Sequence, residues 1–340
     1  MKILSASFGW QTLAVCGVIS AGLALAQVPA GSRVLQSPEV RAGLKPPVIT
    51  ALAVSPNGEL VAAAGDDHQV RLWNFSTGRL LHTLEGHTDW VRALAFSHDG
   101  SRLASGGDDR RVLIWNVATP ALHRASRPIG CCIYGLAFRR DNKQLAAVGF
   151  STELKLIDPQ TAETTQTLEC PNDDMRTVLY SPDGKYMAAA GRAGIVRLWT
   201  ADGGQQVRDL NISSRRIYSI DFSPDSSQVA AAGDERQIRV WKVEQAEEVT
   251  SFPVGVGKVL SLAFCGEDKL ATGGTDNTIH IWRLSAGQEA ARFAGHQGSV
   301  AVLAFDRTSN SLLSGSFDCS VKVWPVGDDV VQRLNGNTPR

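Results

Sequence analysis

The stretch "ASGGDDRRVLIWN", residues 104–116, decides the fold of this chain because its pattern recurs along the sequence. Small residues lead into a polar turn, and an apolar strand then closes on Trp115. Ser105 and Asp109 lie in the stretch, and His87 lies 18 residues before the serine. Serine, histidine and aspartate together suit nucleophilic catalysis, and they equally suit a structural hydrogen-bond chain that fixes a turn to a strand.

Tryptophan gives the period of the repeat. Six of the eight tryptophans follow one another at intervals of 42, 84, 42, 41 and 42 residues: Trp73, Trp115, Trp199, Trp241, Trp282 and Trp324. The double interval has Ile157 at its midpoint, so seven units run from about Val48 to Gly336. A fixed period of this length indicates a repeat architecture.

The order of apolar, polar and small residues in each unit predicts four short strands separated by turns. An apolar run such as "VRALAF" opens the unit, and a polar turn such as "SHDG" follows it. A strand of small residues, a second turn, the tryptophan strand and a weaker last strand complete the unit. The first strand is apolar at nearly every position, which is typical of a strand buried on both faces. Sheets stacked around a ring bury both faces against their neighbours.

These features resemble the WD-repeat β-propeller family over residues 47–336. The marks are the pairs Gly86-His87 and Gly295-His296, an aspartate six residues before tryptophan, and strands such as "VRLW". The resemblance implies an all-β, seven-bladed β-propeller of four-stranded antiparallel blades around a central channel, used mainly to hold protein partners. We expect blades at residues 48–87, 90–129, 132–172, 174–213, 216–255, 258–296 and 299–336, with a short tail at 337–340.

The recurrence of the serine–histidine–aspartate set favours a structural bracket over a catalytic site. A catalytic site is normally made once, and its nucleophile must be exposed. We expect the carboxylate to accept hydrogen bonds from the histidine ring, the serine hydroxyl and backbone amides. Blades 3, 4 and 5 lack the full set, so we expect them to be the softer side of the ring. The bracket residues are His87, Ser105, Asp109 and Trp115 in blade 2, Thr272, Asp276 and Trp282 in blade 6, and His296, Ser314, Asp318 and Trp324 in blade 7.

Two segments are candidates for the outermost strand of blade 7, which must close the ring. The segment Val330–Leu334 occupies the usual fourth-strand position after Trp324. The other candidate, Val34–Val40, runs into Pro38, and a hydrogen-bonded ladder tolerates proline poorly. We therefore expect closure from the C-terminal segment.

Binding residues are expected on one rim of the ring, where the second turn of each blade and the start of its first strand emerge. We call this edge the candidate rim. Three large aromatic residues fall there, and exposed aromatics beside arginine resemble interface anchors. The alternative is that each aromatic folds back onto its blade, or that the rim is a solvated surface of mixed charge. The predicted partner-binding residues are Trp90, Asp108, Phe150, Asp174, Arg192, Arg216, Asp234, Lys258 and Phe317.

An enzymatic or small-ligand function would require a site in the central channel. Asp174, Arg216 and Lys258 form a candidate set for such a site, since they start the first strands of three successive blades. The seven histidines include no HExxH motif, and no phosphate-binding glycine loop precedes a helix. We therefore predict no catalytic residue, no metal and no cofactor.

The first 26 residues have the pattern of a secretory signal peptide. Lys2 precedes an apolar run that closes on Ala24-Leu25-Ala26, which fits cleavage before Gln27. An uncleaved membrane anchor is the alternative. Residues 27–46 contain three prolines and are interpreted as a linker.

Cysteine content gives no clear disulfide framework. If Cys16 leaves with the signal, five cysteines remain, so at least one thiol stays unpaired within the chain. A bridge from Cys131 or Cys132 to Cys170 is geometrically open, because both loops belong to the same rim.

Charge and composition complete the prediction of function. The formal net charge is zero, which gives no basic footprint for nucleic acid. We expect a monomeric, exported propeller, periplasmic or extracellular, that serves as a non-catalytic scaffold for protein partners and has no membrane span after cleavage. The remaining alternatives are a channel enzyme or ligand binder, and an architectural spacer at the envelope.

Overall fold

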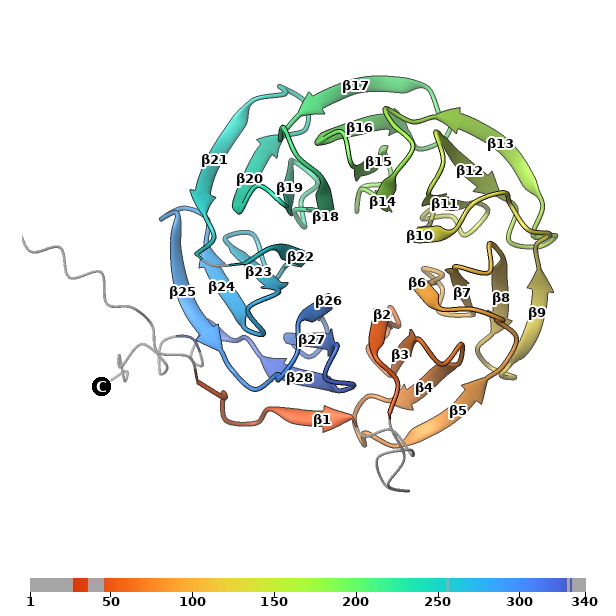
Figure 1. The fold of residues 1–340 in the computed structure, drawn as a ribbon, viewed down its shortest axis with the longest axis horizontal. Coiled ribbons are helices and arrows are strands. Elements are labelled where there is room, and N and C mark those ends of the chain that lie inside the picture. Colours follow the sequence, from red (N-terminus) through yellow and green to blue (C-terminus); the bar gives the residue numbers. More distant parts are fainter. Residues whose placement is uncertain (1–26, 36–45, 256, 329–330, 332–340) are drawn as a thin grey trace, which may run out of the picture.

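The computed structural model describes residues 27–35, 46–255, 257–328 and 331. Over these residues the chain forms seven four-stranded antiparallel sheets, arranged as the blades of a ring (Figure 1). The prediction of an all-β, seven-bladed propeller is confirmed. The predicted signal peptide, 1–26, and the tail, 337–340, lie outside the described residues.

Within each blade the strands follow one another from the channel outwards (Figure 1). The innermost strands are β2 (Ile49–Val54), β6 (Val91–Phe96), β10 (Ile133–Phe138), β14 (Met175–Tyr180), β18 (Ile217–Phe222), β22 (Val259–Phe264) and β26 (Val300–Asp306). The second strands are β3 (Leu60–Gly65), β7 (Arg102–Gly107), β11 (Leu145–Gly149), β15 (Tyr186–Gly191), β19 (Gln228–Gly233), β23 (Lys269–Gly274) and β27 (Ser311–Ser316).

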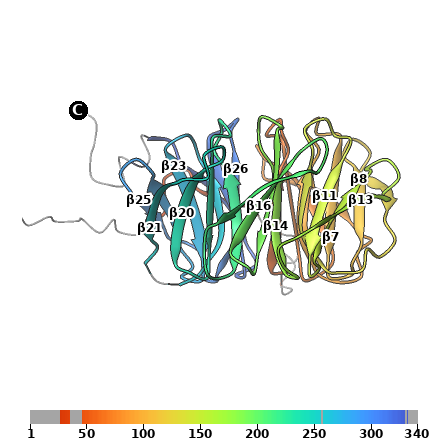
Figure 2. The same cartoon turned by 90° about the horizontal axis from the view of Figure 1, so that it is seen from above.

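The tryptophan strands and the outer strands complete the blades. The third strands are β4 (Val70–Asn74), β8 (Val112–Asn116), β12 (Glu153–Ile157), β16 (Ile195–Thr200), β20 (Gln237–Lys242), β24 (Ile279–Arg283) and β28 (Val321–Pro325). The outermost strands are β5 (Leu80–Leu84), β9 (Ala121–Ala125), β13 (Thr164–Glu169), β17 (Gln206–Asn211), β21 (Glu248–Pro253), β25 (Gln288–Phe293) and β1 (Arg33–Leu35). Seen from the side, the strands run between two rims formed by loops (Figure 2).

The apolar core is divided into separate interfaces between blades. Buried residues form clusters that are each shared by two neighbouring blades. Between blades 2 and 3, for example, Ile114 packs with Ile133 and Phe138, and all three are 3% exposed or less. This explains how 340 residues fold without one large core, since each interface is a small core of its own.

Side-chain hydrogen bonds also join the innermost strands around the channel. Ser219 Oγ accepts from the Leu262 N–H at 3.1 Å, and Ser261 Oγ accepts from the Leu303 N–H at 2.9 Å. Each bond links one blade to the next. The short polar residues within these apolar strands thus hold neighbouring blades at a fixed spacing.

The ring is closed by the N-terminal strand β1, so the expectation of closure by Val330–Leu334 is wrong. β1 pairs antiparallel with β28, with Arg33 opposite Val323 and Leu35 opposite Val321. The described strand covers Arg33–Leu35, and Pro38, on which the expectation was based, lies outside the described residues. Of the C-terminal candidate, Val331 is described, and its N–H donates to Gly327 O as in a helical turn.

Residues around β1 also tie the closing strand to both neighbouring blades, so part of the predicted linker belongs to the ring. The Arg33 guanidinium donates to Ser76 O at 2.6 Å and stacks over the Phe75 ring of blade 1 at 4.7 Å. Gln27 N–H donates to Arg292 O in blade 6 at 3.0 Å. Leu35 is 3% exposed in the core between blades 7 and 1.

Candidate partner-binding rim

In blades 2 to 7, one backbone hydrogen bond per blade builds the candidate rim, and in blade 1 the Val48 N–H donates to the Asp66 carboxylate at 2.8 Å instead. In blade 2, the Asp108 N–H donates to Trp90 O at 2.9 Å, which joins the second turn to the start of the first strand. The same bond joins Phe150 to Cys132 at 3.2 Å and Arg192 to Asp174 at 2.9 Å. The structure thus brings the turn positions and the strand-start positions together on one edge, as the repeat register predicts.

Glycine at the end of the second strand permits this close approach. A Cβ atom at Gly107 would lie 1.9 Å from Trp90 O, and one at Gly149 would lie 1.6 Å from Cys132 O. Neither contact is sterically possible, so only a residue without a side chain fits there. The recurring glycine is therefore required by the rim geometry of these blades, whereas blade 7 has Ser316 at the equivalent position.

The bracket of blade 2 is a buried hydrogen-bond chain. Trp115 Nε1–H donates to Ser105 Oγ at 2.8 Å, Ser105 Oγ lies 2.7 Å from His87 Nε2, and His87 Nδ1 lies 2.7 Å from the Asp109 carboxylate. The serine contacts the histidine and not the carboxylate, which differs from our expectation. If Trp115 donates to the Ser105 hydroxyl, that hydroxyl donates to His87 Nε2, and His87 Nδ1–H donates to the Asp109 carboxylate, every donor in the chain has an acceptor.

Burial decides between the catalytic and the structural interpretations of this set. Ser105 is 0% exposed, so its hydroxyl cannot reach a substrate. Burial alone raises the pKa of the Asp109 carboxyl, but hydrogen bonds from His87 and from the Arg111 and Thr88 N–H groups outweigh it and lower the pKa. The arrangement pins the turn after β7 to the tryptophan strand.

Blades 7 and 6 contain related hydrogen bonds at the equivalent positions. In blade 7, Trp324 Nε1 donates to Ser314 Oγ at 2.8 Å, and His296 Nδ1 lies 2.8 Å from Asp318. In blade 6, Trp282 Nε1 donates to Thr272 Oγ1 at 2.9 Å. Asp276 of blade 6 pairs instead with His280 of the tryptophan strand, at 2.7 Å.

His280 of blade 6 is held between two carboxylates. Its Nδ1 lies 2.5 Å from Glu289, and its Nε2 lies 2.7 Å from Asp276. Burial lowers the pKa of the imidazole, but the two acidic partners outweigh this and raise the pKa to about 9. The pKa of Glu289, which also accepts from Arg292, falls to about 2 against the effect of burial.

Blades 1, 4 and 5 keep the tryptophan but lack the hydroxyl that accepts from it. The position ten residues before the tryptophan is Ala63 in blade 1, Ala189 in blade 4 and Ala231 in blade 5. The indole nitrogens of Trp73 and Trp241 are buried and have no hydrogen-bond partner among the described residues. An unpaired buried donor costs about 1–3 kcal/mol, so the bracket contributes unequally around the ring.

The three predicted aromatic residues lie on the candidate rim and differ in how far their side chains are exposed. Phe150 and Phe317 are each 48% exposed, although Phe150 also contacts Tyr134 edge-on at 5.3 Å. Trp90 is half-buried, and the Arg92 guanidinium covers its ring at 4.3 Å. Half of each phenylalanine surface thus remains available to another molecule.

Sequence reasoning missed a row of arginine and tyrosine residues at the channel mouth. Two residues after the strand start, successive blades place Arg92, Tyr134, Arg176 and Tyr218. The Arg176 guanidinium stacks on the Tyr134 ring at 4.3 Å and on the Phe150 ring at 4.8 Å. The repeat register would have found this row, but we assigned the first strands to burial on both faces.

A shallow depression at the channel mouth has a volume of about 270 Å³. Its lining includes residues from all the blades, among them Thr50, Arg92, Tyr134, Arg176 and Phe317. Because guanidinium groups already occupy the faces of Tyr134, this surface is both aromatic and cationic.

Asp174 is not a surface residue of the candidate rim. Its side chain is 2% exposed and lies between two guanidinium groups, 2.7 Å from Arg176 Nε and 2.7 Å from Arg216 Nη2. A buried carboxylate persists when such partners offset its desolvation. The proposed channel set of Asp174, Arg216 and Lys258 is therefore not an open constellation, because Asp174 is enclosed by its partners and Lys258 pairs with Asp234 at 2.8 Å.

The remaining charged rim residues are placed as follows. Asp108 accepts from Arg92 at 2.8 Å, which leaves its carboxylate engaged within blade 2. Arg192 is 65% exposed and approaches Asp173 at 4.0 Å, a weak surface contact. Asp234 and Lys258 form an ion pair between blades 5 and 6.

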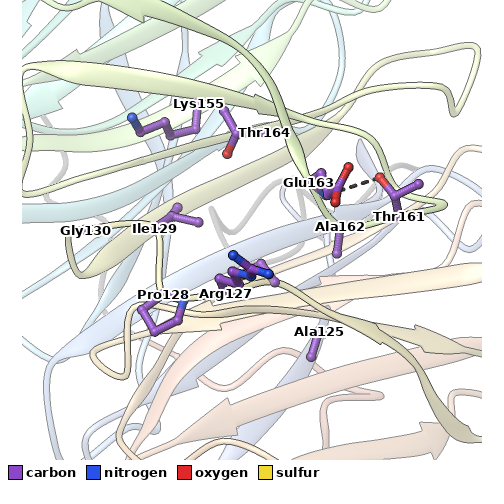
Figure 3. A pocket seen from close by; sticks show the side chains of 11 residues that line it. Ala125, Arg127, Pro128, Ile129, Gly130, Lys155, Thr161, Ala162, Glu163 and Thr164 are labelled. Carbon is purple, nitrogen blue, oxygen red and sulfur yellow. Dashed lines mark hydrogen bonds between the residues drawn. The ribbon is translucent and has the colours of Figure 1, made fainter.

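A second depression lies between blades 2 and 3 (Figure 3). Its volume is about 640 Å³, and Arg127, Ile129, Lys155 and Glu163 are among its lining residues. The Lys155 ammonium is paired with Glu153 at 2.5 Å, so its charge is already engaged.

Two further observations bear on the sequence expectations. Among the described residues, Cys131, Cys132, Cys170 and Cys265 are free thiols, so neither Cys131 nor Cys132 is bridged to Cys170. Among those residues, no helix has the length and apolar character that a membrane crossing requires.

The fold is a β-propeller in which most of the bracket side chains are buried and several residues of the candidate rim are exposed. The family described as "WD domain, G-beta repeat" matches residues 43–74, 78–116, 162–200, 204–242, 247–283 and 287–325. These matches span more than half of the chain, so the protein belongs to this family of WD-repeat proteins. They leave out 117–161, which contains the tryptophan-free strand β12.

One relative shares similarity over a single repeat length. "Probable serine/threonine-protein kinase PkwA" of Thermomonospora curvata is 52% identical over 42 residues. The similar region is 12% of this chain and 6% of that relative. The likeness therefore concerns a repeat unit and covers a small part of the other protein.

Proposed function

We propose that this protein is a non-catalytic scaffold that binds protein partners through its candidate rim. WD-repeat propellers generally serve as protein-interaction scaffolds. The observation that supports a site on this rim is the pair of half-exposed phenylalanines, Phe150 and Phe317, with the Arg176 guanidinium stacked on Phe150. Aromatic and arginine side chains are the residues that most often dominate binding energy at interfaces.

A scaffold agrees better with this geometry than a channel enzyme does. The serine of the bracket is buried, and Asp174 is enclosed by two arginines. A general acid or base must reach a proton on the substrate, and neither group can do so. We infer a monomeric propeller that acts by holding another protein.

Export is part of the proposal and is supported by the N-terminal sequence pattern. Cleavage after Ala26 would leave Gln27 as the first residue, and Gln27 exchanges backbone hydrogen bonds with Arg292 and Ala294 of blade 6. Cleavage at that point thus preserves the ring contact. The intact mass of the protein isolated from the exported fraction tests this: a start at Gln27 supports cleavage, and a retained Met1 contradicts it.

A crosslinking pull-down with matched surface variants tests partner binding. Phe150→Ser/Phe317→Ser removes the two half-exposed phenylalanines of the rim, whereas Leu122→Ser/Val249→Ser removes two residues of similar exposure from outer strands β9 and β21. We expect partners captured by the wild type to be lost with the rim pair and kept with the outer pair. Equal capture by both pairs would move the site away from this rim, and no specific partner would favour the spacer or channel alternatives.

Arg216 is a poor choice for such a test. A charge reversal there would place a second carboxylate beside the buried Asp174, whose partner it now is at 2.7 Å. Leaving a buried charge unpaired costs several kcal/mol, so the variant would report on folding and not on binding.

A further inference from the structure

A cationic depression lies on the candidate rim over blades 4 to 6. Its volume is about 870 Å³. We call it the arginine cleft, and its lining residues are Arg192, Ser214, Arg215, Arg216, Asp234, Glu235, Arg236 and Lys258. Five of these side chains are cationic and two are anionic, so the cleft carries a positive excess within a chain of zero net charge.

The anionic groups of the cleft are already paired within the protein. Asp234 accepts from Lys258 at 2.8 Å, and Glu235 pairs with Arg239 at 3.1 Å. Arg216 forms an ion pair with the buried Asp174. The charges of Asp234, Glu235 and Arg216 are therefore largely offset by pairs within the protein.

Three arginines of the cleft remain for another molecule. Arg215 and Arg236 are exposed and have no ion-pair partner among the described residues, and Arg192 makes one exposed contact at 4.0 Å. They come from three successive loops of blades 4 and 5: the β15–β16 turn, the β17–β18 loop and the β19–β20 turn. The cleft thus offers guanidinium groups in a row from one blade to the next.

Backbone hydrogen bonds hold these loops in place. Ile212 and Ser213 N–H groups both donate to Gly194 O, at 3.1 and 2.9 Å, which ties the loop of Arg215 to the turn of Arg192. Val254 N–H donates to Arg236 O at 3.0 Å. Fixed loops reduce the entropy lost when a ligand binds.

We propose that the arginine cleft binds an acidic, extended segment of a protein partner, with its carboxylates on Arg192, Arg215 and Arg236. This inference rests on the proposed scaffold function and specifies the chemistry of the partner. The planar guanidinium group matches a carboxylate in two parallel hydrogen bonds, which makes arginine suited to this recognition.

A protein segment suits the cleft better than a nucleic acid does. Nucleic acid binding needs a continuous basic stripe that follows many phosphates. Here Asp173, Asp234 and Glu235 interrupt the cations, and the chain as a whole is neutral. A short acidic segment needs contacts with a few cations and avoids the interrupting carboxylates.

Fluorescence anisotropy with a labelled Glu-rich peptide tests the proposal, with a Gln-for-Glu peptide of the same length as its neutral control. Arg215→Ser/Arg236→Ser removes the two unpaired cations of the cleft. Arg79→Ser/Arg124→Ser removes two exposed cations elsewhere and changes the net charge equally. We expect the cleft pair to weaken binding of the acidic peptide by about tenfold or more, the control pair to leave it nearly unchanged, and added salt to weaken it.

Four results of the peptide experiment would overturn the proposal. These are equal binding of the neutral peptide, no loss in the cleft pair, no acidic-peptide binding up to about millimolar concentration, and tighter binding of oligothymidylate than of the acidic peptide. Repeating the partner pull-down with the cleft pair separates this inference from the proposed function. Partners lost with the phenylalanine pair but retained with the cleft pair would overturn the acidic-segment inference and leave the scaffold function standing.

Discussion

Replacing Ser105 with alanine isolates the contribution of one bracket. The change removes a single oxygen from a fully buried site and leaves the backbone of β7 unaltered. Two hydrogen bonds disappear: the one from Trp115 Nε1 at 2.8 Å and the one to His87 Nε2 at 2.7 Å. Both partner atoms then stay buried without an alternative in the bracket.

The expected loss follows from those two atoms. A buried polar atom left unpaired costs about 1–3 kcal/mol, and a serine-to-alanine change creates little cavity. We expect the free energy of unfolding to fall by about 2–4 kcal/mol, with His87 still hydrogen-bonded to Asp109. This is a large part of the stability of an ordinary domain.

Urea denaturation of wild type and variant, compared at equal m-value, measures the loss. Ser101→Ala is the matched control, because the Ser101 hydroxyl lies in an exposed turn and its loss should cost less than about 0.5 kcal/mol. Exchange of the Trp115 indole proton gives a local readout, and it should accelerate in Ser105→Ala. A loss below about 0.5 kcal/mol with unchanged indole exchange would refute the bracket as a stabilising device.

Three more predictions follow from the same structure. Ala231→Ser should stabilise the protein by about 1 kcal/mol in urea denaturation by giving Trp241 Nε1 an acceptor, as Thr272 does for its tryptophan; a destabilised variant would contradict this. His280 has a native pKa of about 9, above the ordinary 6.5, so its contribution should be complete below about pH 6.5 and disappear as pH rises through about 9. Unfolding measured across that range should lose up to about 3 kcal/mol in wild type, and an equal pH dependence in His280→Gln would contradict the assignment. Leu35→Asp should open the ring and accelerate hydrogen exchange in β28, whereas unchanged protection there would show that β1 does not stabilise closure.

The repeat was predictable because its signals are local. Tryptophan spacing, turn residues and small-residue strands all lie within one unit, and seven copies reinforce each other. The candidate rim followed from the same register, and the structure places Asp108 and Phe150 at equivalent points of their blades.

Closure was not predictable because it depends on a non-local pairing. β1 contains three residues, and its partner strand β28 lies almost the whole chain away. A strand of three residues has no hydrophobic period from which it could be predicted, so Pro38 was the main cue in the sequence, and Pro38 does not belong to the described strand. The closure by β1 is stabilised by Leu35, which is buried in the core, and by Arg33, which stacks on Phe75 of the neighbouring blade.

The role of Asp174 was missed for a related reason. Its position in the register suggested an exposed acid, but Arg216 from the next blade reaches back to it at 2.7 Å. Sequence spacing gives the position of a residue within its own blade and does not give the side chains that neighbouring blades extend over it. The same holds for Arg176, which stacks on Tyr134 of the preceding blade.

Photo-crosslinking in the producing cell tests the scaffold claim most directly. The photoreactive residue p-benzoylphenylalanine would replace Phe150 or Phe317 on the candidate rim, and Leu122 or Val249 on the outer strands, all of them 44–48% exposed. Our account predicts a discrete protein adduct from both rim positions and none from the outer positions. Adducts of equal yield from the outer strands, or no adduct from either rim position, would contradict it.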